Sequence, residues 1–217
     1  KNIYGPYERK VVMDQGNSNI NGPHQGAWVN TQTGEDWFLH FQDKDAYGRI
    51  VHMQPMGWKN DWPVIGIDKD GDGKGEPVTE FKKPSVGKIY PINAPATTDE
   101  FSNTSLGLQW QWQANPKEGW AYTTSSGFLR MFCIRPADSL VNYWMLPNIL
   151  TQKLPAETFK CTIKIRFNPA NINDRIGLIM FGMDYAFLSL VKKADAVYIS
   201  YNNCMSADKK KKKKEML

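Results

Sequence analysis

The chain has 217 residues, 41% of them hydrophobic, and its eight tryptophans help to supply enough apolar material for one large β-domain or two modest ones. The formal net charge is +5, but the consecutive lysines at 209–214 account for more than this excess, so no basic face remains for a phosphate backbone. Such a lysine run is typical of a solvated loop or tail. No apolar stretch approaches the roughly 20 residues of a membrane span. Composition therefore indicates a globular protein without nucleic-acid or membrane partners.

Short strand-like runs separated by turn residues fill the first part of the chain. The runs are 37–41, 49–53 and 62–67, and they are bounded by Thr33-Gly34, Tyr47-Gly48 and Lys59-Asn60-Asp61. No longer run has a helical period. Because a four-stranded propeller blade takes roughly 40 to 50 residues, we expect about two blades from residue 1 to about residue 80.

The composition changes between Pro77 and Pro95, where prolines are frequent and large apolar residues are few, so this segment is predicted to contain a linker. After it, residues 106–113 and 161–167 alternate apolar and polar side chains, which predicts strands with one buried and one wet face. Further strand-like runs are 128–134, 176–181, 187–191 and 197–201. Together they predict an antiparallel sandwich, and hence an all-β protein.

Two motifs in the first part of the chain point to a sugar-binding pocket. His24 lies in Gly-Pro-His-Gln-Gly-Ala-Trp-Val (22–29), and Arg49 lies in Tyr-Gly-Arg-Ile-Val-His-Met-Gln-Pro (47–55). A guanidinium offers several donors in a fixed plane and stays charged, and a neutral imidazole can bind a metal or its waters through one nitrogen. The alternative, judged on each residue alone, is a core histidine and a surface cation.

These motifs, with Gly-Pro-Tyr-Glu (5–8) and Gln-Pro-Met-Gly-Trp (54–58), resemble in order and spacing the last blades of the five-bladed propeller enzymes of glycoside hydrolase family 43. Leu-Gln-Trp-Gln-Trp (108–112) is similar to part of the accessory sandwich that follows the propeller in the xylosidase-like branches. The resemblance implies a partial five-bladed β-propeller followed by a jelly-roll-like (concanavalin A-like) β-sandwich. The implied domains are the C-terminal propeller blades at 1–82, a linker at 83–95 and an incomplete sandwich at 96–217.

The resemblance also implies an activity, namely inverting hydrolysis that releases xylose or arabinose units from plant polysaccharide or oligosaccharides. In such an enzyme Arg49 faces the glycone and fixes its hydroxyls, and His24 points into the central cavity, where it helps to hold an ion, often calcium, or a water cluster. No cofactor is required beyond this candidate Ca²⁺. The three catalytic carboxylates of the family precede the histidine motif, so we expect them upstream of Lys1 and expect this fragment alone to be inactive.

Two other functions fit the same sequence. The sandwich alone could be a non-catalytic carbohydrate-binding module, or the chain could be a structural domain that completes a partner's ring. Trp110 and Trp112 bear on the first alternative, because at i and i+2 of a strand they face one side. Exposed, they would form a platform for stacking sugars. Their alternation with glutamines favours a place in the core.

An Asp-rich loop follows the first set of strands. Asp68, Asp70, Asp72 and Gly73 match positions 1, 3, 5 and 6 of an EF-hand calcium loop. Position 12 is Thr79, and Pro77 interrupts the loop. A polar, Gly-rich turn is therefore the favoured interpretation, with weak calcium binding as the alternative.

Overall fold

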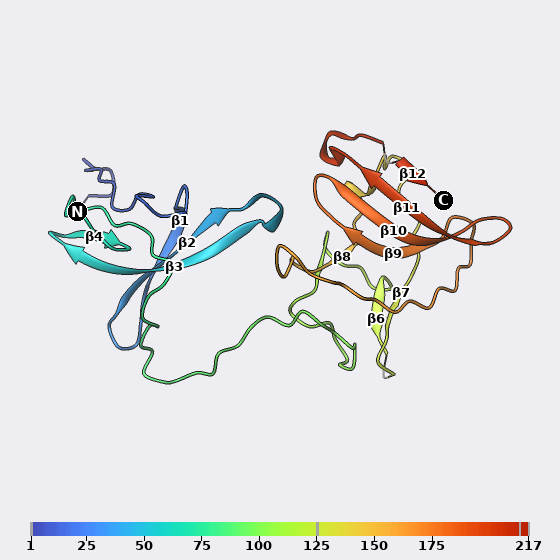
Figure 1. Cartoon of the computed structure of the whole chain (residues 1–217), viewed down its shortest axis with the longest axis horizontal. Helices are drawn as coiled ribbons and strands as arrows, with labels where there is room; N and C mark the ends of the chain where they lie inside the picture. The colour runs from blue at the N-terminus through green and yellow to red at the C-terminus, as the bar shows by residue number, and fades with distance from the viewer. Residues whose placement is uncertain (1, 125, 213, 217) are drawn as a thin grey trace. The chain divides into compact units, whose positions relative to one another are not determined.

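The computed structural model describes the chain except for residues 1, 125, 213 and 217 (Figure 1). It divides into two compact units, Lys1–Asn93 and Ala94–Leu217, and this boundary falls within the predicted linker. The described residues form strands and three short 3-10 helices, η1 (Asp45–Tyr47), η2 (Tyr143–Met145) and η3 (Ala207–Lys209). The all-β expectation is confirmed. Among the described residues, no helix has the length and apolarity needed to cross a bilayer.

The first unit is built on one four-stranded antiparallel sheet in the order β1-β2-β3-β4, drawn in blue to cyan in Figure 1. Its strands are β1 (His24–Asn30), β2 (Asp36–Asp43), β3 (Arg49–Lys59) and β4 (Trp62–Ile65). Each strand pairs with the next one in sequence. A four-stranded meander of this kind is the unit of a propeller blade.

The turns of this sheet lie where the sequence predicts them. Asn60 and Asp61, with φ of 52° and 64°, form the two-residue connection between β3 and β4, and Asn and Asp tolerate this left-handed backbone. Gly48 (φ 73°) closes the turn between β2 and β3, and Gly34 (φ 83°) lies between β1 and β2. A side chain at these glycines would strain the turn.

The expectation of about two blades is wrong for the described residues, which form a single four-stranded sheet in the first unit. Before β1, an isolated bridge joins Met13 to Gly75, and Val12 accepts backbone hydrogen bonds from Ile65 and Gly75. Residues 14–23 are rich in Asn, Gly and Ser, which favour turns over ladder pairing. Chain length alone therefore overestimated the number of strands.

Two buried glutamines fix loops against one face of this sheet. Gln54 is fully buried, accepts from the Val78 amide at 2.7 Å and donates to the Val78 carbonyl at 3.4 Å. Gln42, also buried, donates to the Asn19 carbonyl at 3.1 Å and to the side-chain oxygen of Asn21. These side-chain amides form hydrogen bonds with loop groups that are shielded from water. A buried polar group without a partner would cost stability, so these hydrogen bonds stabilise the loops.

The second unit contains a four-stranded antiparallel sheet in the order β12-β11-β10-β9 and two two-stranded ribbons, β5-β8 and β6-β7. Tyr185, Cys204 and Ala207 form a buried core against which Tyr143 packs, and Val191 is also buried. The strands are β5 (Gln111–Trp112), β6 (Ala121–Thr123), β7 (Leu129–Met131), β8 (Leu150–Thr151), β9 (Arg175–Met180), β10 (Tyr185–Lys192), β11 (Val197–Cys204) and β12 (Lys214–Met216).

Two strands predicted from alternation differ from the structure. Of residues 106–113, only Gln111 and Trp112 form a strand, and residues 161–167 form none. Cys161 and Ile163 are exposed. A segment with alternating polarity forms a half-buried strand only if a neighbouring strand pairs with it and a hydrophobic core covers its apolar face. Within the described residues, 161–167 lack a partner strand, and in 106–113 only Gln111 and Trp112 pair with β8, whereas Leu108 is exposed.

Candidate functional site

His24 is the first residue of β1, and its position is set by a bulge. His24 pairs with Phe41 and Gly26 pairs with His40, so Gln25 is the extra residue, with φ of 46°. A Cβ on Gly26 would lie 2.2 Å from the Leu39 carbonyl oxygen, so only glycine lets β1 come this close to β2. The close approach of β1 and β2 and the bulge at Gln25 thus explain why the Gly-Pro-His-Gln-Gly motif contains glycine at position 26.

The His24 ring is exposed, and its Nδ1 contacts the carbonyl oxygen of Gly22. Because a carbonyl can only accept, this hydrogen bond places a proton on Nδ1. In the neutral ring, Nε2 is then the acceptor nitrogen. That nitrogen is the atom which could bind a metal ion or its water.

Arg49 is the first residue of β3, and it lies beside Phe41. The guanidinium carbon is 4.4 Å from the centre of the Phe41 ring, and Nε lies 3.4 Å from the carboxylate of Asp43. The His24 ring centre lies 4.5 Å from the same phenyl ring, at an interplanar angle of 62°. The structure therefore brings His24 and Arg49 together around one aromatic side chain.

The other two histidines form a pair on the opposite face of the sheet. His40 and His52 are cross-strand partners whose rings stack at 5.3 Å, and His52 Nε2 lies 3.2 Å from Gln42 Oε1. His40 is 2% exposed, and its buried Nε2 has no hydrogen-bond partner among the residues that the structure describes. Burial lowers the pKa of both histidines below the ordinary value.

This pair predicts a loss of stability at acid pH. Since the folded pKa of each ring lies below its unfolded value near 6.5, the unfolded state binds more protons as the pH falls through about 6.5, and the folded state loses stability until its own pKa is passed. We expect the urea midpoint, followed by tryptophan fluorescence, to be lower at pH 5.5 than at pH 7.5. His40→Leu should reduce this difference. An equal pH dependence in the variant would contradict the assignment.

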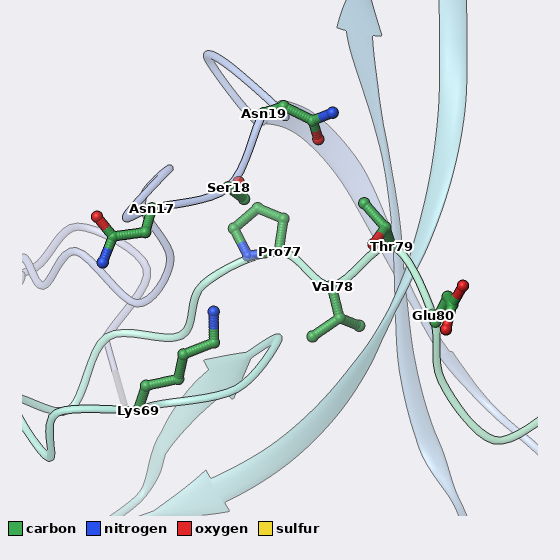
Figure 2. Close-up of a pocket in the computed structure, with 8 residues that line it drawn as sticks. All are labelled: Asn17, Ser18, Asn19, Lys69, Pro77, Val78, Thr79 and Glu80. Atoms are coloured by element: carbon green, nitrogen blue, oxygen red, sulfur yellow. The ribbon is translucent and has the colours of Figure 1, made fainter.

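A polar pocket of about 520 Å³ lies elsewhere in the first unit (Figure 2). Lys69 points between Asn17 and Pro77 in this view, and its Nζ lies 3.0 Å from Glu76 Oε2. That ion pair, with the Asn17 amide, lowers the pKa of Glu76. The residues that line the pocket are Asn17, Ser18, Asn19, Lys69, Pro77, Val78, Thr79 and Glu80. His24 and Arg49 are not among them.

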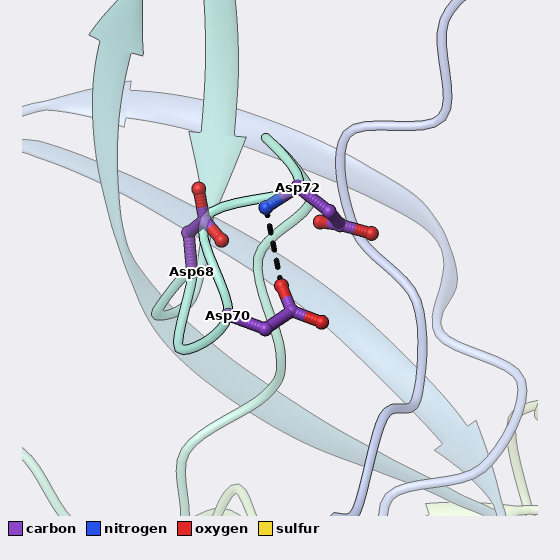
Figure 3. Close-up of side chains that lie close together, drawn as sticks. All are labelled: Asp68, Asp70 and Asp72. Atoms are coloured by element: carbon purple, nitrogen blue, oxygen red, sulfur yellow. Dashed lines mark hydrogen bonds between the residues drawn. The ribbon is translucent and has the colours of Figure 1, made fainter.

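The three aspartates of the Asp-rich loop converge, with one carboxylate oxygen of each within 4.8 Å of the others (Figure 3). Their oxygens already accept hydrogen bonds within the loop. Asp68 accepts from the amides of Gly71 and Gly73, and Asp70 accepts from the Asp72 amide at 3.2 Å. Asp72 accepts from the Lys74 amide and pairs with Lys74 Nζ at 2.7 Å.

These contacts are those of a self-contained turn, in which a calcium ion would compete with the Lys74 ammonium for Asp72. We expect the midpoint of thermal unfolding in millimolar Ca²⁺ to lie within about 1 °C of the midpoint measured with a chelator. A ligand raises this midpoint only if it binds the folded protein. Asp70→Asn serves as the matched variant and should behave identically. A rise with Ca²⁺ that Asp70→Asn abolishes would show that the loop is a calcium site.

Trp110 and Trp112 do not share one exposed platform. Trp110 stacks on Phe101 at 5.7 Å and donates from Nε1 to Asp99 at 2.7 Å. Trp112 packs edge-on against the buried Trp120 at 5.4 Å. Both indoles are half-buried, which supports the interpretation that they belong to the packing of the sandwich.

Sequence reasoning missed an aromatic cluster around Asp36. This carboxylate is the first residue of β2, directly before the predicted run 37–41, and accepts from the indole N–H groups of Trp28 at 2.8 Å and Trp58 at 2.9 Å. Hydrogen bonds from Asn30 and then from Trp28 lower the pKa of Asp36. The local sequence around Asp36 does not indicate this cluster. Trp58 lies 22 residues away in sequence, and the two residues meet only through the register of β2 and β3.

A four-stranded antiparallel sheet with His24 and Arg49 at one end, followed by a second antiparallel unit, defines an all-β class of protein. Residues 98–216 match the β-xylosidase C-terminal concanavalin A-like domain of glycoside hydrolase family 43, and the chain belongs to this family.

The names of similar known proteins are consistent with this family assignment. A putative β-xylosidase of Xylanibacter ruminicola is 43% identical over 204 residues, which are 93% of this chain and 37% of the relative. A non-reducing end α-L-arabinofuranosidase of Bacteroides ovatus is 24% identical over 83% of this chain and 35% of the relative. The solved structure of a bifunctional protein of Bacteroides eggerthii, which includes a family 43 part, is 26% identical, with a TM-score of 0.61, over 93% of this chain and 25% of that one. The chain thus spans about a third of the length of the curated relatives.

Proposed function

We propose that this chain is the C-terminal part of an inverting O-glycosyl hydrolase that releases xylose or arabinose units from plant polysaccharide or oligosaccharides. One observation carries the proposal: His24 and Arg49, separated in sequence, pack on the same ring at one end of a blade-like sheet. The family match of the second unit supports the same assignment.

In this proposal the two side chains bind and position, and they do not transfer protons. Arg49 directs a planar, permanently charged set of donors at the hydroxyls of the glycone. His24, with Nδ1 committed to Gly22, uses Nε2 to hold a water cluster or a calcium ion beneath the sugar. Hydrolysis by inversion needs no cofactor, because two carboxyl groups and a water molecule suffice. Those carboxyl groups belong to residues outside this chain.

The ligand class is a xylo- or arabino-oligosaccharide. The two relatives named above divide between these sugars, one being a putative β-xylosidase and the other an arabinofuranosidase. The pocket walls that choose between the two sugars are contributed by blades outside this chain.

The test uses the longer enzyme that contains this chain, with nitrophenyl β-xyloside and nitrophenyl α-L-arabinofuranoside as paired substrates. We expect turnover of at least one, and NMR of the first-formed sugar should show inversion at the anomeric carbon. Retention of configuration would contradict the inverting mechanism. Xylan binding without turnover of either substrate would instead support the non-catalytic carbohydrate-binding module.

A further inference from the structure

We propose that Phe41 is a positioning residue, which holds the His24 imidazole and the Arg49 guanidinium in one fixed arrangement. The inference rests on the proposed function for its biochemical meaning, whereas its geometry rests on contacts in this chain. The Phe41 ring centre lies 4.4 Å from the guanidinium carbon of Arg49 and 4.5 Å from the ring centre of His24. One half-buried phenyl ring thus contacts both residues.

The sheet register explains why this ring reaches both side chains. Phe41 lies on β2, between β1 and β3, and its direct partner on β1 is His24. Arg49 is paired with Asp43, which lies on the same face of β2 as Phe41, because side chains at i and i+2 share a face. Arg49 therefore reaches diagonally across the strand pair to cover the phenyl ring, as long side chains do in antiparallel sheets.

The ion pair of Arg49 is too weak to fix its guanidinium, and the further contact of His24 is one hydrogen bond from Nδ1 to the Gly22 carbonyl. The Arg49–Asp43 pair is 3.4 Å apart, and its side chains are 63% and 65% exposed, so solvent screens it and it contributes little. His24 directly precedes the bulge residue Gln25 and is exposed. The negative face of an aromatic ring attracts a guanidinium, and an edge-on imidazole contact is the favoured geometry for an aromatic pair. Phe41 thereby restricts both side chains before a sugar binds. The loss of conformational entropy on binding is then smaller.

The first test is NMR of the 217-residue chain with three variants. Phe41→Leu removes the ring, Phe41→Tyr keeps it, and Phe38→Leu is the matched control, because Phe38 lies on the same strand and the opposite face. We expect Phe41→Leu to move the Arg49 side-chain and His24 ring resonances toward their values in unfolded peptides, since the ring-current shift is lost. Phe41→Tyr should retain the shifts, and Phe38→Leu should leave them in place. Unchanged resonances in Phe41→Leu would overturn the proposal.

The second test measures kinetics in the longer enzyme. An exposed cation–π contact predicts about a two- to fivefold loss of kcat/KM in Phe41→Leu, and Phe41→Tyr should restore it. An equal loss in both variants would show that Phe41 serves packing alone and would overturn the proposal. An inactive wild-type enzyme, with the NMR shifts lost as expected in Phe41→Leu, would refute the proposed function while leaving the positioning geometry intact.

Discussion

The purified 217-residue chain is expected to hydrolyse neither nitrophenyl xyloside nor nitrophenyl arabinofuranoside. Inverting hydrolysis requires a carboxylic acid that protonates the leaving oxygen and a carboxylate that activates water, about 6.5–9.5 Å apart. Each proton transfer contributes roughly 10²–10⁴-fold to the rate. A chain without both groups therefore loses essentially all measurable turnover.

Four carboxyl groups of the first unit are unsuited to the role of general acid. A general acid needs a pKa raised toward neutrality, usually by an apolar surrounding. In the described part of the first unit, every carboxyl group whose pKa clearly departs from its ordinary value is shifted downward, because hydrogen bonds stabilise the charged form. These groups are Glu35, Asp36, Asp72 and Glu76.

The measurement compares release of nitrophenol by the chain with release by the longer enzyme at equal molar concentration. Circular dichroism of the same sample checks that the chain is folded, so that an absence of turnover cannot be assigned to unfolding. Turnover by the chain above that of a heat-inactivated sample would mean that this sequence carries its own acid and base. The assignment of the catalytic carboxyl groups to residues outside the chain would then be wrong.

Arg49→Ala in the longer enzyme is expected to lower kcat/KM by about 10- to 150-fold. A hydrogen bond from a charged donor contributes about 1.5–3 kcal/mol, and each 1.36 kcal/mol corresponds to a factor of ten in rate. Arg49→Lys should recover little of the loss, because an ammonium has neither the planar fork of a guanidinium nor its capacity to stack on Phe41.

The matched control for Arg49 is Lys59→Ala. Lys59 is a cation at the other end of β3 and lies 3.8 Å from Asp68, so its removal changes the same formal charge away from His24 and Phe41. Michaelis constants and turnover numbers for both variants check the prediction. Near wild-type kinetics for a folded Arg49→Ala would show that another residue binds the glycone.

The hairpins of the first unit were predictable because their information is local. Asn60, Asp61 and Gly48 adopt the left-handed backbone that their residue types favour, and apolar residues between these turns form β2 to β4. The segments that failed did so for a non-local reason. Residues 161–167 alternate like a strand, yet among the described residues no neighbouring strand pairs with them.

The outer face of the β9–β12 sheet also departs from simple alternation. Leu178, Leu188, Tyr201 and Met216 stand side by side across the four strands and are exposed. The opposite, buried face includes the polar residues Ser189 and Asn202. Polarity alone therefore did not predict which face of this sheet lies against the core.

By itself the sequence determined the all-β class, the turn positions and the two motifs that contain His24 and Arg49, because residue type and short spacing specify each of them. Only the tertiary structure decided that both side chains meet on Phe41 and that Asp36 holds Trp28 and Trp58. Those contacts depend on strand register, which pairs residues by cross-strand geometry. A local pattern places a residue on a strand, whereas the neighbours of that residue follow from which strands pair and in which register.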